Sequence, residues 1–298
     1  MTLSLSTPLS KKLGLRYPIV SAPMFIVSNP DMMVACAEAG ILGTMPTLNA
    51  RNASDLRASI EYIRRKTDKP FGLNMTIRMT DPDRLEADIQ TCLEFEVPVI
   101  VTSYGNPTDI VRRAHEKKMT VFHDVINLKH AKIAQASGVD AVIAVAAGAG
   151  GHAGATSPFV LYPYLIENLD VPVIAAGCIA TGRQIAASFA LGTQLAYIGT
   201  RFIATSECGA NDEYKAAVIN GMPEDIVYTD QVSGVNGNFI RSTVPALNPE
   251  TKSDAKKWKE IWSAGQGVAL AKNVKPIGEV VEDLIREYHD AVAGLPRA

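Results

Sequence analysis

A glycine-rich stretch with a single histidine is the first feature of this sequence that can do chemistry. Residues 142–154 read VIAVAAGAGGHAG, an apolar run that passes into glycine and alanine around His152. Small residues let the backbone come close to a flat ligand, and an imidazole, with an ordinary pKa of about 6.5, exchanges protons near neutral pH. We therefore predict that His152 is an acid–base catalyst. The alternative is a histidine that only hydrogen-bonds its own loop.

Two glycine-containing turns are candidates for holding a phosphate. They read AAGCIATGRQ (175–184) and AYIGTRF (196–202). Gly177 and Gly199 allow close approach, and the Thr200 hydroxyl can donate a hydrogen bond. The alternative is ordinary loop glycine. The sequence has neither GxGxxG after its first apolar run nor GxxxxGK[ST], which argues against a Rossmann or P-loop nucleotide site.

The other histidines and the cysteines are weaker candidates. His123 lies mid-strand in TVFHDV and is as readily a core residue as a functional one. We expect solvated helix positions for His115, His130 and His289. We expect a packing role for Cys178, since nothing near it in sequence marks an activated thiol.

Eight short apolar runs, each followed by an amphipathic helical stretch, must position these residues. The apolar runs are residues 17–24, 41–49, 70–77, 97–105, 119–127, 139–150, 171–177 and 193–205. The helical stretches are residues 30–40, 54–67, 81–96, 107–118, 128–138, 159–170, 182–192 and 211–221. We expect Pro30 to open and Gly40 to close the first helix, and Ser54 to cap the second.

The number and character of these units predict the fold. Several runs lack polar alternation, as parallel strands covered by helices do. Eight units without a ninth predict an α/β fold of the (β/α)8 TIM-barrel type rather than an open doubly wound sheet. In such barrels function lies at the carboxyl ends of the strands, and phosphate is often bound after strands seven and eight, where the two glycine turns fall.

The chain divides into three parts by pattern. We assign residues 1–221 to the barrel with its cofactor site. Residues 222–260 are polar and turn-rich, and we interpret them as an inserted lobe or lid. Residues 261–298 hold two helical stretches, 261–273 and 277–295, that we expect to pack on the barrel.

Composition limits the class of partner. With 47% hydrophobic and 20% charged residues and a net charge of −2, the chain has material for a sizeable core and no basic block for nucleic acid or an anionic membrane. The amino-terminal residues hold no apolar core of signal-peptide length, and no apolar run approaches the length of a membrane span. The four cysteines are far apart without metal-type spacing. We therefore expect a cytoplasmic protein with reduced thiols, no metal, and a small-molecule substrate.

Several motifs together resemble a known family. YPIVSAPM, PFGLNMTI, AGGHAG, VPVIAAGCIATG, GTRF and the late IWSAGQGV occur in this order over nearly the whole chain. They resemble the nitronate monooxygenase (2-nitropropane dioxygenase-like) family of FMN-dependent TIM-barrel oxidoreductases. The same framework occurs in flavin-type enoyl-thioester reductases and in flavin-dependent NADH:quinone reductases, so the motifs specify the superfamily better than the substrate.

The resemblance implies a set of cofactor-binding residues. Those that line or contact the flavin are Ala22, Pro23, Met24, Asn74, Thr76, Gly150 and Gly151. Those that hold the phosphate of FMN are Ala176, Gly177, Gly199 and Thr200. His152 takes the place of the family's catalytic histidine, where it removes the acidic proton beside a nitro group or stabilises the anionic nitro oxygens.

Two positions depart from the family pattern. A glutamine or acidic residue often lies seven positions before the histidine and a glutamate four before it, where this chain has Val145 and Gly148. The resemblance implies oxidation of alkyl nitronates by O2 to carbonyl compounds and nitrite. The alternatives are an FMN-dependent NAD(P)H:quinone or enoyl-thioester reductase, and a non-catalytic flavin-binding barrel.

Overall fold

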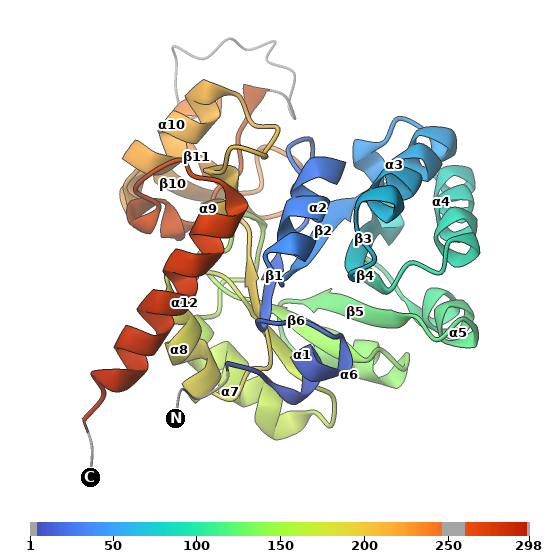
Figure 1. Cartoon of the computed structure of the whole chain (residues 1–298), viewed down its shortest axis with the longest axis horizontal. Coiled ribbons are helices and arrows are strands. Elements are labelled where there is room, and N and C mark those ends of the chain that lie inside the picture. Colours follow the sequence, from blue (N-terminus) through green and yellow to red (C-terminus); the bar gives the residue numbers. More distant parts are fainter. Residues whose placement is uncertain (1–4, 246–259, 297–298) are drawn as a thin grey trace.

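Eight parallel strands close into a barrel in this computed structural model, which describes residues 5–245 and 260–296. The strand order around the barrel is β1-β2-β3-β4-β5-β6-β8-β9 (Figure 1). The strands are β1 (Ile19–Ser21), β2 (Leu42–Pro46), β3 (Phe71–Thr76), β4 (Val99–Ser103), β5 (Thr120–Val125), β6 (Ala141–Val145), β8 (Val173–Ala176) and β9 (Ala196–Ile198). The predicted (β/α)8 fold is therefore confirmed.

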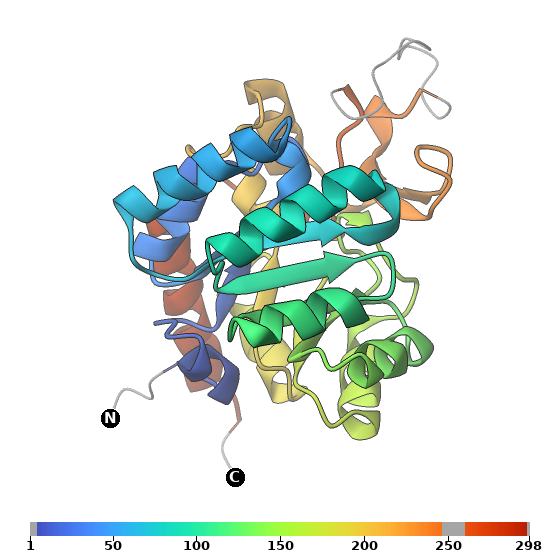
Figure 2. The same ribbon diagram turned by 90° about the vertical axis from the view of Figure 1, so that its right-hand side faces the viewer.

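Helices follow the strands and form the outer shell. They are α2 (Pro30–Glu38), α3 (Ala53–Lys66), α4 (Pro82–Glu94), α5 (Thr108–Glu116), α6 (Leu128–Ala136), α7 (Pro158–Asn168), α8 (Gly182–Ala190) and, after β9, α10 (Asp212–Asn220). Figure 2 shows α3, α4 and α5 side by side on one outer face of the barrel.

Asparagine side chains start several of these helices. Asn29 accepts a hydrogen bond from the Met32 N–H, and Pro30 follows it at the first helical position, as predicted. The predicted cap of α3 is wrong: Asn52, not Ser54, accepts from the Asp55 N–H, and the helix begins at Ala53. Asparagine and serine can both cap a helix, so the residue pattern alone could not distinguish Asn52 from Ser54 as the cap.

The strands bury both faces. Along β4, Val99 and Val101 pack in the barrel interior, whereas Ile100 packs against the outer helices. At the amino-terminal end of the barrel, Leu9 of the short helix α1 (Pro8–Lys12) belongs to the interior cluster. The interior is thus a packed core closed at one end, which leaves the carboxyl ends of the strands as the open end.

Two predicted elements differ from the structure. The eighth apolar run does not continue as a strand to residue 205, because the strand ends at Ile198 and a short helix α9 (Thr200–Ile203) follows Gly199. The predicted helix over 261–273 is also wrong, since only a 3-10 turn, Gln266–Leu270, forms there. A Cβ at Gly265 would lie 2.4 Å from the Gly148 carbonyl oxygen, so this segment packs backbone to backbone against another loop instead of forming a helix.

A small antiparallel sheet lies at the open end of the barrel. β10 (Ile226–Thr229) and β11 (Gly237–Ile240) pair with each other, and β11 also pairs with β7 (Gly151–His152). The hairpin is the orange element that stands at one end of the barrel in Figure 2. Residues 246–259 of the predicted lobe lie outside the described residues, as do residues 1–4 and 297–298, and the division at 221 and 260 stays a prediction.

The last helix, α12 (Ile277–Ala293), packs along the outside of the barrel against α8 and α2 (Figure 1). The packing on α8 is close, because a Cβ on Gly182 would lie 2.0 Å from the Leu284 carbonyl oxygen. None of the helices in the described ranges combines the length and apolar character that crossing a membrane requires.

Candidate active site

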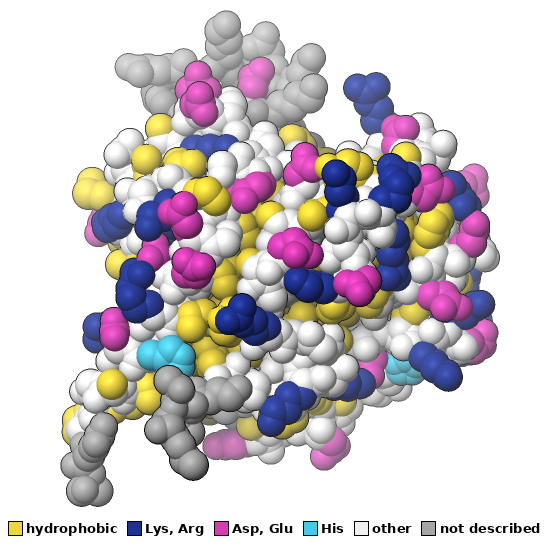
Figure 3. Space-filling model, viewed as in Figure 1, with side chains coloured by type: hydrophobic (Ala, Val, Ile, Leu, Met, Phe, Trp, Pro, Cys, Tyr) yellow, Lys and Arg dark blue, Asp and Glu magenta, His cyan; other side chains and the backbone are white. Residues whose placement is uncertain are grey.

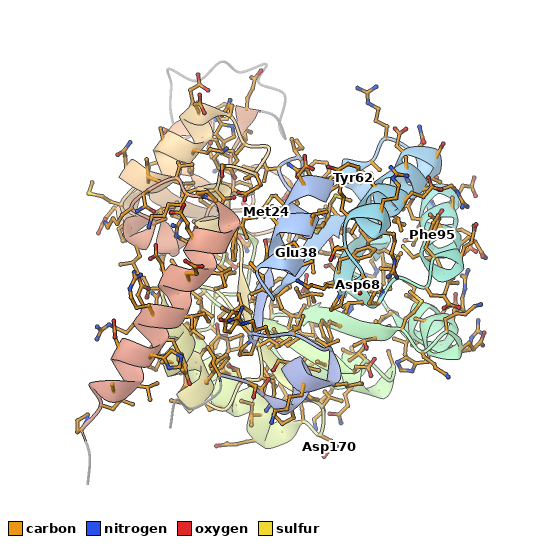
Figure 4. The ribbon with its side chains drawn as sticks, in the orientation of Figure 1. Met24, Glu38, Tyr62, Asp68, Phe95 and Asp170 are labelled. Atoms are coloured by element: carbon orange, nitrogen blue, oxygen red, sulfur yellow. The ribbon has the colours of Figure 1, made fainter. Side chains whose placement is uncertain are left out.

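A cavity of about 700 Å³ opens at the carboxyl ends of the barrel strands. It is lined by every residue that the sequence predicted for the site: Ala22, Pro23, Met24, Asn74, Thr76, Gly150, Gly151, His152, Ala176, Gly177, Gly199 and Thr200. Figure 4 shows Met24 toward the end of the molecule that carries β10 and β11, and Asp170, which precedes β8, at the opposite end. The fold therefore gathers residues from the ends of five barrel strands, β1, β3, β6, β8 and β9, into one place.

His152 lies on β7 and is held by neighbours on two sides. Its Nε2 is 2.7 Å from the Ser233 Oγ, which comes from the turn between β10 and β11. The ring of Tyr104, after β4, meets the imidazole edge to face with centroids 5.2 Å apart. Burial lowers the pKa of His152 below its ordinary 6.5, because it disfavours the charged ring. The imidazole is therefore neutral and basic at pH 7.

The hairpin holds the backbone of the histidine loop. Gly151 and His152 pair with Asn238 and Gly237 of β11. The buried Asn238 side chain donates a 2.7 Å hydrogen bond to the Ala149 carbonyl. Since buried amides are costly to leave unpaired, these contacts make the hairpin part of the site rather than a remote lobe.

The two glycine turns meet at the same wall of the cavity. Gly177 has φ +119°, a conformation that favours glycine, and is followed by Cys178 at φ +57°. Thr200 is 8% exposed, and its Oγ1 accepts a 2.9 Å hydrogen bond from the Gly265 N–H. Because the threonine oxygen already accepts, its own proton remains to be donated to a ligand.

A chain of polar side chains crosses the ends of β3, β4 and β5. Asn74 Nδ2 donates to the Ser103 Oγ at 2.9 Å, and the Ser103 hydroxyl donates to Asp124 Oδ2 at 2.6 Å. Nδ2 also donates to the Val101 carbonyl, which uses both amide protons and leaves the Asn74 carbonyl oxygen as an acceptor.

Asp124 is the carboxylate at the end of this series of hydrogen-bonded side chains. Its Oδ1 is buried and has no hydrogen-bond partner among the described residues, and burial raises its pKa to about 6. Because an unpaired buried carboxylate oxygen is costly, a ligand that donates a hydrogen bond is the natural partner for Asp124.

The structure explains one departure from the family pattern. Gly148 has φ +79°, and a Cβ there would lie 2.4 Å from the Cys178 Sγ and 2.8 Å from Gln266 Oε1. A glutamate therefore has no room at this position, because the thiol and the late amide fill it. Val145, at the end of β6, lines the cavity with an apolar side chain.

The residues at the mouth of the cavity are apolar, and one of them has a strained backbone conformation. Phe25, Ile26 and Met79 line it and are 45%, 42% and 45% exposed. Ile26 has φ +71°, which is rare for a β-branched residue, and the Asn49 side chain accepts from its N–H at 2.8 Å. Asn49 thus holds an unfavourable loop conformation that keeps two large apolar side chains at the mouth.

The remaining histidines lie outside the cavity lining. His123 is buried beneath it, with Nδ1 2.8 Å from Thr102 Oγ1, and its pKa is lowered to about 4 by burial. His115 lies on α5, where Nε2 meets Asp140 at 2.9 Å. Within the described ranges no group of three or more His, Cys, Asp or Glu side chains is placed to hold a metal ion.

Sequence reasoning did not assign a role to several side chains of the site. Ser103, Tyr104 and Asp124 fall at strand ends that it identified, so their position on apolar runs was the available signal. Ser233 had no such signal, because its contact with His152 joins residues far apart in the chain. Cys178, expected to serve packing, lines the cavity.

Charges of both signs are mixed over the surface. On the face in Figure 3, Lys and Arg alternate with Asp and Glu, in keeping with the net charge of −2. The cavity lining itself contains neither lysine nor arginine among the described residues. Among the described lining residues, the groups that could hold an anion are hydrogen-bond donors and His152.

Comparison with known proteins gives consistent results over most of the chain. The family model described as nitronate monooxygenase matches residues 6–287. A nitronate monooxygenase from Paraburkholderia phytofirmans is 29% identical and covers 95% of both chains. An octahydroindene carboxyl-CoA dehydrogenase from Rhodococcus jostii is 29% identical over 91% of this chain and 80% of its own. The crystal structure of a nitroalkane oxidase from Streptomyces ansochromogenes superimposes with a TM-score of 0.85, at 26% identity, over 97% and 99% of the two chains.

Proposed function

This chain belongs to the nitronate monooxygenase family, whose members are flavin-dependent oxidoreductases, and we propose that it is an FMN-dependent nitronate monooxygenase. The proposed reaction is the oxidation of alkyl nitronates by O2 to carbonyl compounds and nitrite. The observation that carries the proposal is a neutral, basic His152 in a cavity whose mouth is apolar. A group that removes a proton from carbon beside a nitro group needs these properties.

The residues of the cavity fit a flavin. Gly151 has open space where a Cβ would be, so a planar ring can approach its backbone. Asn74 offers an acceptor and Asp124 an unpaired oxygen to the polar edge of such a ring. Ala22, Pro23, Met24, Thr76 and Gly150 complete the proposed contacts around it.

A single phosphate fits the two glycine turns. Gly177 and Gly199 bring backbone close to the ligand, Ala176 precedes the first turn, and the Thr200 hydroxyl has a proton to donate. No lysine or arginine among the described residues lines the cavity to neutralise a diphosphate. On these grounds we propose FMN rather than FAD.

When bound, the flavin supplies an electron acceptor that can in turn be reoxidised by O2. The chain's own residues bind the substrate and manage its proton. His152 takes the proton from the carbon beside a neutral nitro group, and the resulting imidazolium attracts the anion that forms. Phe25 and Ile26 at the mouth contact alkyl groups and limit the entry of water.

A second candidate function is reduction of the carbon–carbon double bond of an enoyl thioester with electrons from NAD(P)H. It is favoured by the exposed apolar residues at the mouth, which suit an acyl chain, and by the similarity to the carboxyl-CoA dehydrogenase. The mouth residues named here carry no positive charge for the phosphates of coenzyme A, which favours the first candidate. A cytoplasmic location stays a prediction.

Anaerobic reduction of the bound flavin tests the proposal. We expect the purified protein to be yellow, to lose its flavin absorbance with propyl-2-nitronate, and to keep it with NADH or NADPH. Loss with NAD(P)H alone, with the nitronate inert, overturns the proposal in favour of the reductase. A colourless protein that takes up no FMN overturns the cofactor assignment as well.

A further inference from the structure

Ser233 connects the hairpin to the histidine through its side chain. It lies in the turn between β10 and β11, and its Oγ is 2.7 Å from His152 Nε2. The same Oγ donates a hydrogen bond to the Val235 carbonyl at 3.2 Å. Both contacts belong to one hydroxyl, which has a single proton.

The single proton of the Ser233 hydroxyl determines which group donates in the hydrogen bond between Ser233 and His152. With the Ser233 proton directed to the Val235 carbonyl, which can only accept, the serine oxygen accepts from His152 and the ring proton is on Nε2. A neutral imidazole carries one proton, so the basic lone pair then lies on Nδ1.

We propose that Ser233 is a positioning residue that holds His152 in the Nε2-protonated tautomer and thereby assigns proton removal to Nδ1. The inference rests on the proposed function of His152. In the step that it serves, the C–H bond beside the nitro group breaks, its electron pair stays on the substrate as the nitronate, and the proton moves to Nδ1. Ser233 does not touch the reacting atoms.

The surroundings of the ring make such orientation effective. The β7–β11 pairing fixes the His152 backbone, and the Tyr104 ring contacts the imidazole from another side. The Tyr228 hydroxyl donates to the Ala153 carbonyl at 2.9 Å, so the next residue of the loop is held as well. With the backbone held and the Tyr104 ring on one side, a hydrogen bond to Nε2 can select the tautomer of the ring.

The described titratable groups near the histidine loop include Tyr104 and Asp124, which line the cavity, and Tyr228, which contacts Ala153. Tyr104 and Tyr228 are phenols, and burial raises the pKa of Tyr104 to about 12, so it stays protonated throughout the working range. Asp124, from β5, has its pKa raised to about 6 and can titrate near His152. A test must therefore compare variants in which Asp124 is unchanged.

Removal of the Ser233 hydroxyl should shift the pKa of His152 in a direction that depends on the tautomer. A hydroxyl that accepts from Nε2–H stabilises the imidazolium more than the neutral ring, because the bond is then charge-assisted. Its loss lowers the pKa of His152. A hydroxyl that donates to Nε2 would stabilise only the neutral ring, and its loss would raise that pKa.

Nitrogen NMR on the flavin-loaded protein measures both the tautomer and the pKa of His152. We expect the ring 15N shifts of His152, assigned with His152→Gln, to show a protonated Nε2 in the parent protein. Ser233→Ala should lower the pKa of His152 by about 0.5–1 unit. Ser233→Thr, which keeps the hydroxyl, should restore both tautomer and pKa. Thr229→Ala, which removes another hydroxyl near this turn, should change neither. A rise in pKa, or a protonated Nδ1 in the parent, overturns the inference.

Turnover separates this inference from the proposed function. With a neutral nitroalkane, Ser233→Ala should lower kcat/KM about tenfold, whereas a nitronate, which needs no proton removal, should be oxidised within about twofold of the parent rate. The proposed function fails if neither substrate is oxidised by the parent, even when the NMR result stands. An expected activity profile combined with an unchanged tautomer in Ser233→Ala overturns the positioning role alone.

Discussion

The chemistry proposed for His152 depends on its burial and on the neighbours that hold its ring. Burial lowers its pKa, and its contacts include the Ser233 hydroxyl and the Tyr104 phenol ring. A carboxylate at position 148 would have raised the histidine pKa and repelled an anionic substrate. The space that such a side chain would need is filled by Cys178 and Gln266. The residue at 148 thus favours a neutral base and an anionic product.

The pH dependence of turnover follows from that lowered pKa. With a neutral nitroalkane, kcat/KM should rise with pH through a pKa below 6.5 and be level at pH 7, because the basic form of His152 predominates above its pKa. His152→Ala should retain flavin and lose about 10²-fold or more in kcat/KM with this substrate. The measurement is a pH–rate profile from pH 5 to 8 on both proteins. An unchanged rate in His152→Ala removes the residue from the mechanism.

At the scale of elements, the site is built where turns of the barrel meet the hairpin. The turn after β8 takes a glycine conformation at Gly177, and β11 extends the histidine strand into a three-stranded sheet. Each element contributes backbone geometry more than charge. Changes in that geometry should therefore affect ligand binding before they affect the whole fold.

Gly177→Ala tests the turn. The φ of +119° is strained for alanine, and the new Cβ would lie 3.2 Å from the Ala146 carbonyl oxygen. We expect a loss of about 1–2 kcal/mol in the free energy of unfolding and weaker FMN binding. Gly14→Ala is the matched control, with φ +68° and no atom within 4 Å. It should cost stability but leave FMN affinity unchanged, and equal FMN affinities in the two variants would contradict the role given to Gly177.

Asn238→Ala tests the hairpin. Loss of its buried hydrogen bond to the Ala149 carbonyl should cost about 1–3 kcal/mol and loosen residues 148–154. Hydrogen exchange of those backbone amides should become faster in the variant. Asn236→Ala is the control, since Asn236 is exposed in the turn before β11, and it should leave the exchange rates unchanged. Unchanged protection in Asn238→Ala would show that the hairpin is not what orders the loop.

At the scale of the whole molecule, two buried titratable groups on β5 make stability depend on pH. His123 has its pKa lowered to about 4, whereas the neighbouring Asp124 has its pKa raised to about 6. A histidine with a lowered folded pKa contributes stability above about 6.5 that is lost as the pH falls through 4. The aspartate works in the opposite direction, since its contribution is present at low pH and lost as the pH rises through 6.

Replacing His123 isolates one of these two effects. His123→Asn keeps a polar group near Thr102 but cannot titrate. The parent should lose on the order of 2–3 kcal/mol more than this variant between pH 7 and pH 4. Urea unfolding at several pH values measures the difference. If the difference between the two proteins is the same at pH 7 and pH 4, His123 is not charged on unfolding in this range.

The sequence alone determined the barrel and the end of it at which the candidate site lies. Short, continuously apolar runs and amphipathic helical stretches are local properties of the chain, so the eight units could be predicted, and the carboxyl ends of the strands in a barrel share one face. His152 and the two glycine turns could be predicted because their residue types carry chemistry or conformational freedom by themselves. Less local features were missed, such as the end of the eighth strand at Ile198 and the absence of a helix over 261–273.

Only the tertiary structure decided which side chains work together. The contact of Ser233 with His152, the chain from Asn74 through Ser103 to Asp124, and the close approach of Gly265 to Gly148 join residues far apart in sequence. No local pattern encodes such pairs, because each depends on where two separate elements are brought by the packing of the barrel. Residue types alone proposed a base and a cofactor, and the fold supplied the hydrogen bonds that hold the candidate side chains in place.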